Sequence, residues 1–408
     1  MSQPAAAFDL FSPAFHADPF PTYRAMREQA PLFALPFGDA TAIFATRFAE
    51  VERLVADERL TMNMTAWDGY VVEGPGNPRA RFARVALDSM SARDGAQHTR
   101  LRRLVNQGFT PRAMAAFDAN LVALVRERVA AVAERERFDL HRELSQRVPV
   151  IAIARLIGVP EQDEARFAAW ADRMILAGDP FAADAVIADG ADAMDELERY
   201  LDALLERRRA APRADLLSEL LATQDGAERL TGGEIRALCQ TLLIAGSETT
   251  TNLIDLGAKA LIDRPAVRAQ LEADPSRIPD AVEETLRFDH PGKFLARVAR
   301  EDVALGDRAG VLAKGGLVLL GIGAAHRDPE RFPDPDRFDL DRDAREAIAF
   351  GRGRHSCLGA RLARREGALV LAAVLPWIAR LRYDPGAIVW RHSLIVRGTE
   401  SFPVVRAG

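Results

Sequence analysis

The feature that most constrains this chain is the decamer Phe-Gly-Arg-Gly-Arg-His-Ser-Cys-Leu-Gly at residues 350–359. It places Cys357, one of only two cysteines, in a glycine-rich loop directly before an apparent helix start. A helix N-terminus carries unpaired N–H groups and partial positive charge, which lower the pKa of a thiol and favour the thiolate. Gly351, Gly353 and Gly359 let the backbone approach a flat ligand closely and adopt positive φ angles. A thiolate held in this way suits the single axial ligand of a haem iron.

The decamer resembles the cysteine-loop signature of the cytochrome P450 family, Phe-x-x-Gly-x-His-x-Cys-x-Gly. Its five defined places are occupied by Phe350, Gly353, His355, Cys357 and Gly359. The resemblance implies haem b as the cofactor and O2 as the co-substrate. It makes Cys357 the metal ligand and places four further residues of the loop at the cofactor: Phe350, Gly351, His355 and Gly359. The alternative, a buried structural cysteine, is the usual fate of a free Cys, but the resemblance makes it the weaker interpretation.

Composition excludes several classes of protein. The chain has 408 residues, 48% of them hydrophobic, and a net charge of −5 that gives no reason to expect a nucleic-acid partner. Two cysteines cannot build a disulfide framework, a four-cysteine zinc site or an iron–sulfur cluster, and they suit a reducing compartment. The first residues lack a signal-peptide pattern, and the longest apolar stretches, 315–325 and 367–379, are too short to span a bilayer. We therefore expect a cytoplasmic protein without a membrane anchor, which within the family resembles the bacterial type.

The pattern along the chain is mainly helical, without repeats, low-complexity linkers or composition breaks. We expect one haem-binding domain over residues 1–408, mainly α with small β-sheets, the fold that the resemblance also implies. Residues 32–45 alternate loosely around Gly38-Asp39 and predict a hairpin. Thr110 and Pro111 predict the cap and first turn of a helix that ends near residue 134. The glycine-rich span 60–95 is expected to be an irregular loop, and residues 389–405 a second hairpin.

A capping box, Thr231-Gly-Gly-Glu234, predicts the start of a helix that reaches about Asp263. Within it lies Ala-Gly-Ser-Glu-Thr-Thr at 245–250, and Leu242, Ala245 and Thr249 share one face. A Thr hydroxyl there can bond back to a carbonyl one turn earlier. The alternative is an ordinary helix with a glycine and two threonines. The resemblance instead places this stretch over the distal face of the haem, with Ala245 and Gly246 at the cofactor and Glu248 and Thr249 as a catalytic acid–alcohol pair for proton delivery.

Charged residues fall into two groups. Glu284 and Arg287 lie at i and i+3 on one helix face, and the resemblance implies that this pair is buried and structural. Haem propionates require cations, and the resemblance proposes four: His98 and Arg102, one turn apart, then Arg297 and His355. Taken singly, each of these is as well explained by a solvated surface charge.

No segment resembles a flavin or iron–sulfur domain, so electrons must come from a separate protein, expected to be a ferredoxin with an NAD(P)H-dependent ferredoxin reductase. Arginines crowd the cysteine loop and would steer an acidic partner. They are Arg352, Arg354, Arg361, Arg364 and Arg365, with Arg100 and Arg103 as further candidates. A solvated helix face explains them equally well.

The substrate pocket should be apolar. Its expected lining residues are Leu242, Ala245, Phe294, Leu295 and Ile395, although such side chains belong to a core just as often. Lys293 is hypothesised to meet a polar group of the substrate, against the simpler expectation that it faces solvent or a propionate. His326 stands where the family usually has Asn, and no function follows from that.

These features predict a haem-thiolate monooxygenase that inserts one oxygen atom from O2 into a hydrophobic small molecule. A peroxide-driven enzyme of the same fold and a non-catalytic haem sensor or carrier are the alternatives, and the Glu248–Thr249 pair disfavours both. A Cys–His nucleophile pair formed by Cys357 and His355 lacks any accompanying oxyanion-hole motif.

Overall fold

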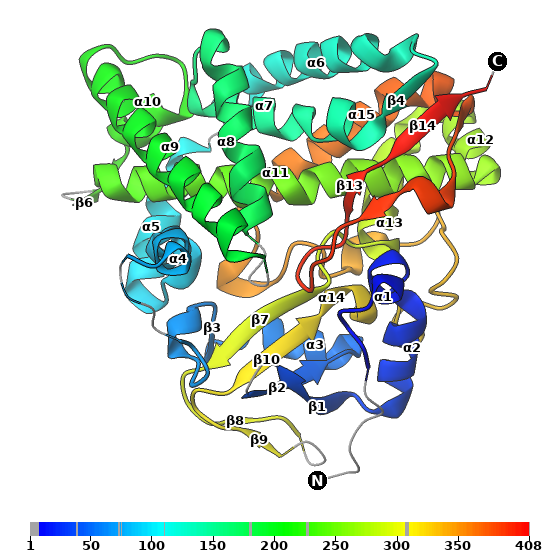
Figure 1. The fold of residues 1–408 in the computed structure, drawn as a ribbon, viewed down its shortest axis with the longest axis horizontal. Helices are drawn as coiled ribbons and strands as arrows, with labels where there is room; N and C mark the ends of the chain where they lie inside the picture. Colours follow the sequence, from blue (N-terminus) through cyan, green and yellow to red (C-terminus); the bar gives the residue numbers. More distant parts are fainter. Residues whose placement is uncertain are drawn as a thin grey trace. The chain divides into compact units, whose positions relative to one another are not determined.

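The computed structural model describes residues 8–37, 40–71, 74, 76–109, 111–178, 182–225, 228–306 and 310–407. The chain forms two compact units. Unit 1 comprises Met1–Val71, Ala133–Arg142 and Asn252–Gly408, and unit 2 comprises Val72–Val132 and Glu143–Thr251. Helices dominate and the sheets are small, which confirms the predicted fold class (Figure 1). The expectation of one domain over residues 1–408 stays a prediction.

Unit 1 contains a five-stranded mixed sheet in the order β1-β2-β10-β7-β3. Its strands are β1 (Leu32–Phe37), β2 (Ala40–Ala45), β3 (Leu60–Thr61), β7 (Phe294–Ala299) and β10 (Leu317–Gly321). β1 and β2 form the predicted antiparallel hairpin, whose expected turn at Gly38-Asp39 lies outside the described residues. β10 runs parallel to β2 and antiparallel to β7, which pairs antiparallel with β3. The sheet thus brings the segment that carries Arg297 into its interior.

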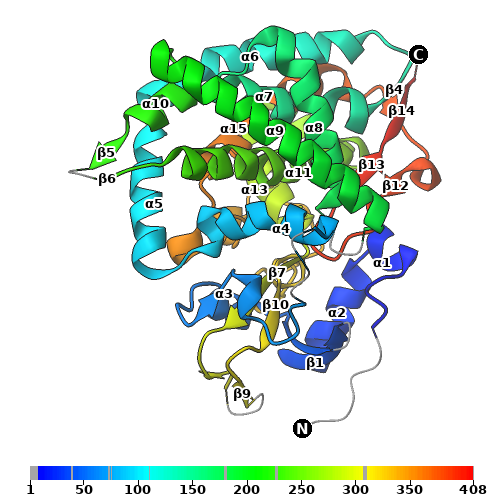
Figure 2. The same cartoon turned by 60° about the vertical axis from the view of Figure 1, so that its left-hand side comes forward.

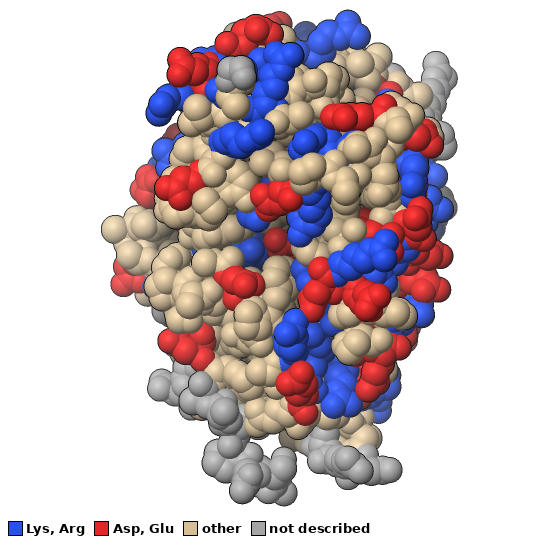
Figure 3. All heavy atoms as spheres, turned by 90° about the vertical axis from the view of Figure 1, so that its right-hand side faces the viewer, with Lys and Arg blue, Asp and Glu red and all other residues tan. Residues whose placement is uncertain are grey.

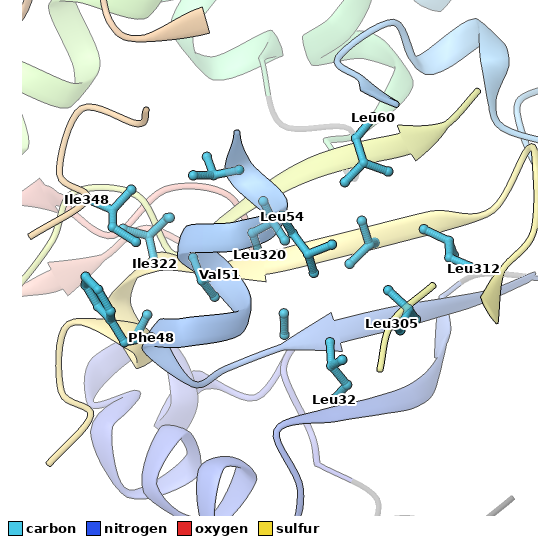
Figure 4. Packing of buried hydrophobic residues seen from close by; sticks show 14 of the residues in the cluster. Leu32, Phe48, Val51, Leu54, Leu60, Leu305, Leu312, Leu320, Ile322 and Ile348 are labelled. Carbon is cyan, nitrogen blue, oxygen red and sulfur yellow. The ribbon is translucent and has the colours of Figure 1, made fainter. Parts of the chain in front are cut away.

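Both faces of this sheet are buried. Alternate side chains of each strand point to opposite sides, so the strands contribute to two separate hydrophobic clusters. On one face, Val51 and Leu54 of α3 (Phe48–Val55) pack with Leu320 and Leu60 (Figure 4). On the other face, Tyr23 and Met26 of α2 (Phe20–Gln29) belong to a cluster with Phe44 and Phe294. Each such side chain contributes about 1.5–3 kcal/mol when fully buried, so the strands form a firm base for the loops that follow them.

The remaining elements of unit 1 come from distant parts of the chain. Its helices are α1 (Pro13–Ala17), α12 (Pro265–Ala273), α13 (Ile278–Phe288), α14 (Ile322–Ala325) and α15 (Ala360–Ile378), and α13 packs on α15. A hairpin of β12 (Val389–Trp390) and β13 (Thr399–Ser401) lies within the span predicted as a hairpin. The final strand, β14 (Pro403–Arg406), instead pairs with β11 (Leu381–Arg382) and β4 (Arg137–Asp139).

Unit 2 is almost entirely helical. It holds α5 (Gly95–Gly108), α6 (Pro111–Ala133), α7 (Arg147–Ile157), α8 (Glu164–Ala177), α9 (Asp184–Ala210) and α10 (Leu216–Ala222), with a short ribbon of β5 (Gln224–Asp225) and β6 (Glu228–Arg229). The predicted helix after Pro111 is confirmed, while its expected cap, Thr110, lies outside the described residues. α8 and α9 lie side by side (Figure 2), and the indole N–H of Trp170 donates to Glu196 at 2.9 Å.

The predicted long helix is α11 (Gly232–Asp263), whose residues 232–251 belong to unit 2 and 252–263 to unit 1. Its capping box is confirmed, because the Thr231 N–H donates to Glu234 Oε2 at 2.8 Å and the Glu234 N–H donates to Thr231 Oγ1 at 3.2 Å. This reciprocal pair satisfies two N–H groups at the helix start and fixes where the helix begins.

The expectation of an irregular span over 60–95 is wrong in one respect, since α4 (Pro78–Asp88) lies within it. The Asn77 side chain accepts a hydrogen bond from the Arg79 N–H at 2.8 Å, and Pro78 occupies the first turn. Asn-Pro is a helix-start signal that the surrounding glycines obscured. Ion pairs hold α4 on α9, among them Arg79–Asp184 at 2.7 Å and Arg84–Glu198 at 2.8 Å.

Candidate active site

The cysteine loop presents Cys357 as an exposed thiol that is not in a disulfide, three residues before α15 begins. Its backbone N–H donates to the carbonyl oxygen of Phe350 at 2.9 Å, which closes the loop. Gly351 and Gly353 have φ angles of 68° and 73°, values that favour glycine, so the predicted use of glycine for positive φ is confirmed at both. Gly359 is the N-cap of α15 and has an ordinary φ of −84°. An exposed thiol near a helix N-terminus is chemically suited to ligate a haem iron.

A buried ion pair in α13 holds residues 326–339, a segment that precedes the cysteine loop in the chain. Arg287 donates through Nε and Nη2 to the two carboxylate oxygens of Glu284 at 2.8 and 2.7 Å, and both side chains are buried. The guanidinium also donates to three backbone carbonyls, those of His326, Pro335 and Arg337, at 2.9–3.1 Å. Glu284 in turn accepts from the Asp339 N–H at 2.9 Å. The predicted buried, structural pair is therefore confirmed.

Two histidines near this pair make buried contacts that the sequence does not indicate. His326 is buried and its Nε2 accepts from the Ile348 N–H at 2.9 Å. His290 lies with Nε2 2.9 Å from the carbonyl oxygen of Ala349. Their rings meet edge to face, with centroids 5.1 Å apart. The only sequence signal was His326 in place of the usual Asn, and no spacing rule connects either residue to 348–349.

The distal signature lies on α11 within unit 2. Ala245 and Thr249 are exposed one turn apart, and Leu242 is partly buried on the same face. Thr249 Oγ1 donates to the Ala245 carbonyl at 2.8 Å, which confirms the predicted back-bond. Glu248 beside it is partly buried. This face therefore combines a small residue, an alcohol and a neighbouring carboxylate.

Gly246, expected at the cofactor, has a packing role that the sequence did not indicate. A Cβ at this position would lie 3.0 Å from Cδ1 of Ile153, so the glycine lets α7 approach α11. A side chain there would have to displace Ile153.

The candidate propionate cations are distributed over both units. His98 and Arg102 lie one turn apart on α5 of unit 2, with His98 buried and Arg102 partly buried. In unit 1, Arg297 lies in β7, is 5% exposed, and donates through Nη1 to the Ala296 carbonyl at 2.9 Å. His355 ends a short 3₁₀ turn and is partly exposed. A buried guanidinium and a partly exposed imidazole are suitable groups for anionic carboxylates.

Among the expected pocket residues, Phe294 requires correction. It is fully buried and packs edge to face against Phe44 and Tyr23, with centroids 5.4 and 6.1 Å apart. Strand alternation places it on the opposite face of the sheet from Leu295. Phe294 is therefore a core residue, while Leu295 and Ile395 of unit 1 and Leu242 of unit 2 are partly exposed and stay candidates.

Lys293 also differs from expectation, because it faces neither solvent nor an open pocket. Its side chain is 1% exposed, and Nζ donates to His16 Nδ1 at 2.8 Å and to the Ser393 carbonyl at 2.7 Å. Its backbone N–H donates to the Ile395 carbonyl at 2.7 Å. Lys293 thus joins α1, the start of β7 and the segment around Ser393, three regions far apart in sequence.

This contact makes folding sensitive to pH through His16. Burial lowers the pKa of His16 from 6.5 to about 4, helped by the positive charges of Lys293, His392 and Arg397. Between these pH values the unfolded chain binds more protons, so the free energy of unfolding falls as pH decreases. We expect the wild type to lose about 2 kcal/mol from this group between pH 8 and pH 5. Urea unfolding at both pH values should show a smaller loss for His16→Asn, and equal losses would contradict the assignment.

The arginine cluster near the cysteine loop is largely neutralised by carboxylates. In unit 1, Arg352 pairs with Glu52 at 2.7 Å, Arg354 with Glu58 and Arg364 with Glu283. In unit 2, Arg100 pairs with Glu234 and Arg103 with Glu228. Arg361 is exposed, and no carboxylate of the described residues pairs with it. Figure 3 shows the same mixing of basic and acidic side chains on the face that it draws.

Comparisons with known proteins identify the family. The family model of cytochrome P450 matches residues 185–376. Vitamin D(3) 25-hydroxylase of Pseudonocardia autotrophica is 38% identical over 401 residues, covering 97% of this chain and 96% of that protein. The 6-deoxyerythronolide B hydroxylase of Saccharopolyspora erythraea is 36% identical over 406 residues, with coverages of 97% and 98%. The crystal structure of CYP109E1 from Bacillus megaterium in complex with corticosterone is 30% identical, has a TM-score of 0.83, and is matched over 97% of this chain and 100% of that one.

The two relatives and the solved structure match nearly the whole chain and confirm the predicted family, fold and reaction class. Within the described ranges, no helix has both the length and the apolar character that crossing a bilayer requires. The chain belongs to the cytochrome P450 family and is a monooxygenase that uses haem b and O2 to oxidise hydrophobic small molecules, with electrons from a separate redox partner.

Proposed function

We propose that Cys357 holds the haem iron as a thiolate, with Phe350, Gly351, His355 and Gly359 of the same loop against the cofactor. The observation that carries this proposal is the exposed thiol in a closed, glycine-kinked loop at the start of α15. Arg297 and His355 from unit 1, and His98 and Arg102 from unit 2, are proposed to meet the propionates. A thiolate-ligated haem supplies cleavage of the O–O bond, so that one oxygen atom enters a C–H bond and the other leaves as water with two protons and two electrons.

We propose that the two protons reach the distal side through Glu248 and Thr249. Because the Thr249 hydroxyl donates its own proton to the Ala245 carbonyl, its lone pairs are left to accept from a water molecule. The Glu248 carboxylate, one residue earlier and partly buried, can exchange protons between that water and solvent. Holding a water at this place is the part of the reaction that these side chains perform.

Replacing Thr249 with valine tests this role. Valine keeps the shape but removes the hydroxyl, so NAD(P)H consumption should continue while product per NAD(P)H falls about tenfold or more, in line with general acid–base contributions. Thr250→Val is a matched control, since Thr250 is buried beside it. Product and NAD(P)H are quantified together with surrogate redox proteins. Equal ratios of product to NAD(P)H in wild type and Thr249→Val would remove the proposed relay.

The substrate is proposed to be a bulky, mainly hydrocarbon member of the hydrophobic small molecules. This proposal is supported by relatives named for vitamin D(3) and 6-deoxyerythronolide B and by a similar structure that holds corticosterone. The candidate pocket residues of each unit, Leu242 and Ala245 in unit 2 and Leu295 and Ile395 in unit 1, have apolar side chains. Titration with steroids and macrolactones, followed by the spin-state shift of the iron, would identify the preferred class of substrate. Shifts with small acids or amines alone would exclude the proposed class.

We further propose that the redox partner is an acidic ferredoxin, reduced by an NAD(P)H-dependent ferredoxin reductase. Arg361, exposed in the first turn of α15, is the cluster member best suited to an intermolecular contact, because Arg352, Arg354 and Arg364 already pair with carboxylates. Charge complementarity at such a surface mainly raises the association rate. The predicted cytoplasmic location stays a prediction.

Reversing the charge at Arg361 should slow reduction by ferredoxin. We expect Arg361→Glu to lower the reduction rate roughly threefold to tenfold at low ionic strength, with the difference shrinking as salt screens the contact. Arg380→Glu is a control with the same change of charge. Arg380 is exposed and lies just beyond the C-terminal end of α15, so it is about 28 Å from Arg361 at the helical rise per residue. Stopped-flow reduction under CO measures both. Equal slowing by the two variants would show that net charge, not this surface, controls the rate.

A further inference from the structure

The two buried histidines, His290 and His326, make bonds that define their protonation. His326 Nε2 accepts from the Ile348 N–H at 2.9 Å, so its proton is on Nδ1, which lies 3.2 Å from the Leu286 carbonyl. His290 Nε2 lies 2.9 Å from the Ala349 carbonyl oxygen, which can only accept, so Nε2 carries a proton, while Nδ1 lies 2.8 Å from both the N–H and the carbonyl oxygen of Gly292. The His326 contacts therefore define a neutral ring with its proton on Nδ1, whereas His290 carries a proton on the other nitrogen, Nε2.

The surroundings keep both rings neutral. Burial, followed by the neighbouring ring of His290, lowers the pKa of His326 well below its ordinary value, and the positive charge of Arg287 acts in the same direction. Burial also lowers the pKa of His290, against the opposing effects of the Ala349 and Gly292 carbonyls and of Asp289. A protonated His326 would present an N–H donor to the Ile348 N–H donor and break that contact.

The pair engages the two residues that precede the cysteine loop. His326 holds the N–H of Ile348, and His290 holds the carbonyl of Ala349. The Ile348 carbonyl then accepts from the Gly351 N–H at 3.0 Å, and the carbonyl of the next residue, Phe350, accepts from the Cys357 N–H at 2.9 Å. An unbroken series of backbone contacts therefore runs from the two imidazoles to the cysteine.

The other nitrogen of each ring contacts the backbone at or just after the end of α13. The Leu286 carbonyl, bound by His326, belongs to the last turn of α13, where carbonyls lack partners within the helix. The adjacent Arg327 donates to the Phe288 carbonyl at 2.8 Å in the same turn. Gly292, bound by His290, follows the same helix. The rings thus connect the rigid end of α13, which also carries Glu284 and Arg287, to the start of the cysteine loop.

We propose that His326 and His290 are positioning residues that hold the cysteine loop in the one arrangement in which Cys357 can ligate the iron as a thiolate. The proposal rests on the proposed role of Cys357. Removing the His326 ring leaves the Ile348 N–H and the Leu286 carbonyl buried without partners, so loop arrangements that misplace the thiol gain population. A histidine serves here because a single ring spans two backbone groups with one donor and one acceptor.

The test compares His326→Leu, His326→Asn and wild type in the reduced, CO-bound state, in which the Soret band distinguishes thiolate ligation from a protonated or displaced thiol. Loss of a buried hydrogen bond should lower the ratio of thiolate-type to other bands about tenfold in His326→Leu. Asn offers a donor and an acceptor on a shorter side chain, so His326→Asn should recover most of the ratio. An unchanged ratio in His326→Leu would overturn the proposal.

His141→Leu is the matched control for general destabilisation. His141 is also buried in unit 1, but it bonds to Asp255 at 2.6 Å and does not contact the segment 348–349. We expect it to lower the free energy of unfolding while leaving the Soret ratio unchanged. A change as large as that in His326→Leu would show that global stability, not loop position, determines the ratio.

A measurement on the unsubstituted protein covers the case in which His326→Leu does not fold. Nitrogen-15 imidazole shifts of the ferrous CO complex should show two neutral rings of opposite tautomer. A protonated ring, or the same tautomer in both, would overturn the proposal. If the wild type itself lacks a thiolate-type band, the proposed role of Cys357 fails; if the band is present but insensitive to His326, only the positioning role fails.

Discussion

Replacing Cys357 with alanine is expected to abolish O2-dependent product formation and to remove the thiolate-type Soret band of the reduced, CO-bound protein. The side chain is the only thiol in the loop 350–359, its residue is exposed, and its backbone N–H donates to the Phe350 carbonyl at 2.9 Å. The anionic sulfur of Cys357 would supply the electron donation that favours O–O cleavage on a bound haem, and alanine cannot supply it. Product formation with surrogate redox proteins and the CO spectrum are measured on the same preparation.

The other cysteine supplies the control for this experiment. Cys239 is 1% exposed, and burial raises the pKa of its thiol to about 12. It is therefore a small apolar residue rather than a ligand. Cys239→Ala should leave the Soret band in place and cost no more than about 1–2 kcal/mol of stability. Retained turnover in Cys357→Ala, or loss of the band in Cys239→Ala alone, would refute the assignment of the ligand.

Replacing Arg287 with methionine should produce the largest loss of stability in unit 1. The substitution leaves the buried Glu284 carboxylate without its bidentate partner and deprives three backbone carbonyls of their donor. Breaking a buried pair in this way costs about 3–5 kcal/mol, a large part of a typical 5–15 kcal/mol total. Urea unfolding and the haem content per chain should both fall sharply.

An exposed arginine of the same region gives the comparison. Arg337 is 67% exposed and lies 3.7 Å from Asp339, so Arg337→Met should change stability by no more than ~0.5 kcal/mol. Haem content of that variant should match the wild type. If Arg287→Met were as stable as Arg337→Met and bound a full complement of haem, the Glu284–Arg287 pair would not have the structural role given to it here.

The parts of the site that sequence predicted share one property, short spacing. The cysteine loop, the helix start after it, the Thr231–Glu234 capping box and the Glu284–Arg287 pair each lie within ten residues. Local rules of capping, glycine geometry and i, i+3 pairing are enough to interpret them. The back-bond of Thr249 to Ala245 was predictable for the same reason.

What sequence could not predict depends on contacts between distant segments. The sequence gives no sign that the Lys293 side chain contacts His16, because His16 lies 277 residues earlier in the chain. Phe294 was placed in the pocket because its strand register, and hence its face, is set by pairing with β10. His326 and Ile348 are 22 residues apart, and Gly246 owes its identity to Ile153 on another helix. Packing determines these roles, so pattern alone left them unassigned.

The central claim is that the sulfur of Cys357 binds the haem iron as an anion. The most direct measurement is the spectrum of the purified wild-type protein after reduction and addition of CO. We expect one dominant Soret band at the long wavelength of thiolate-ligated haem, lost in Cys357→Ala. A band typical of imidazole ligation, or a protein that binds haem equally well and with the same spectrum when Cys357 is alanine, would contradict it.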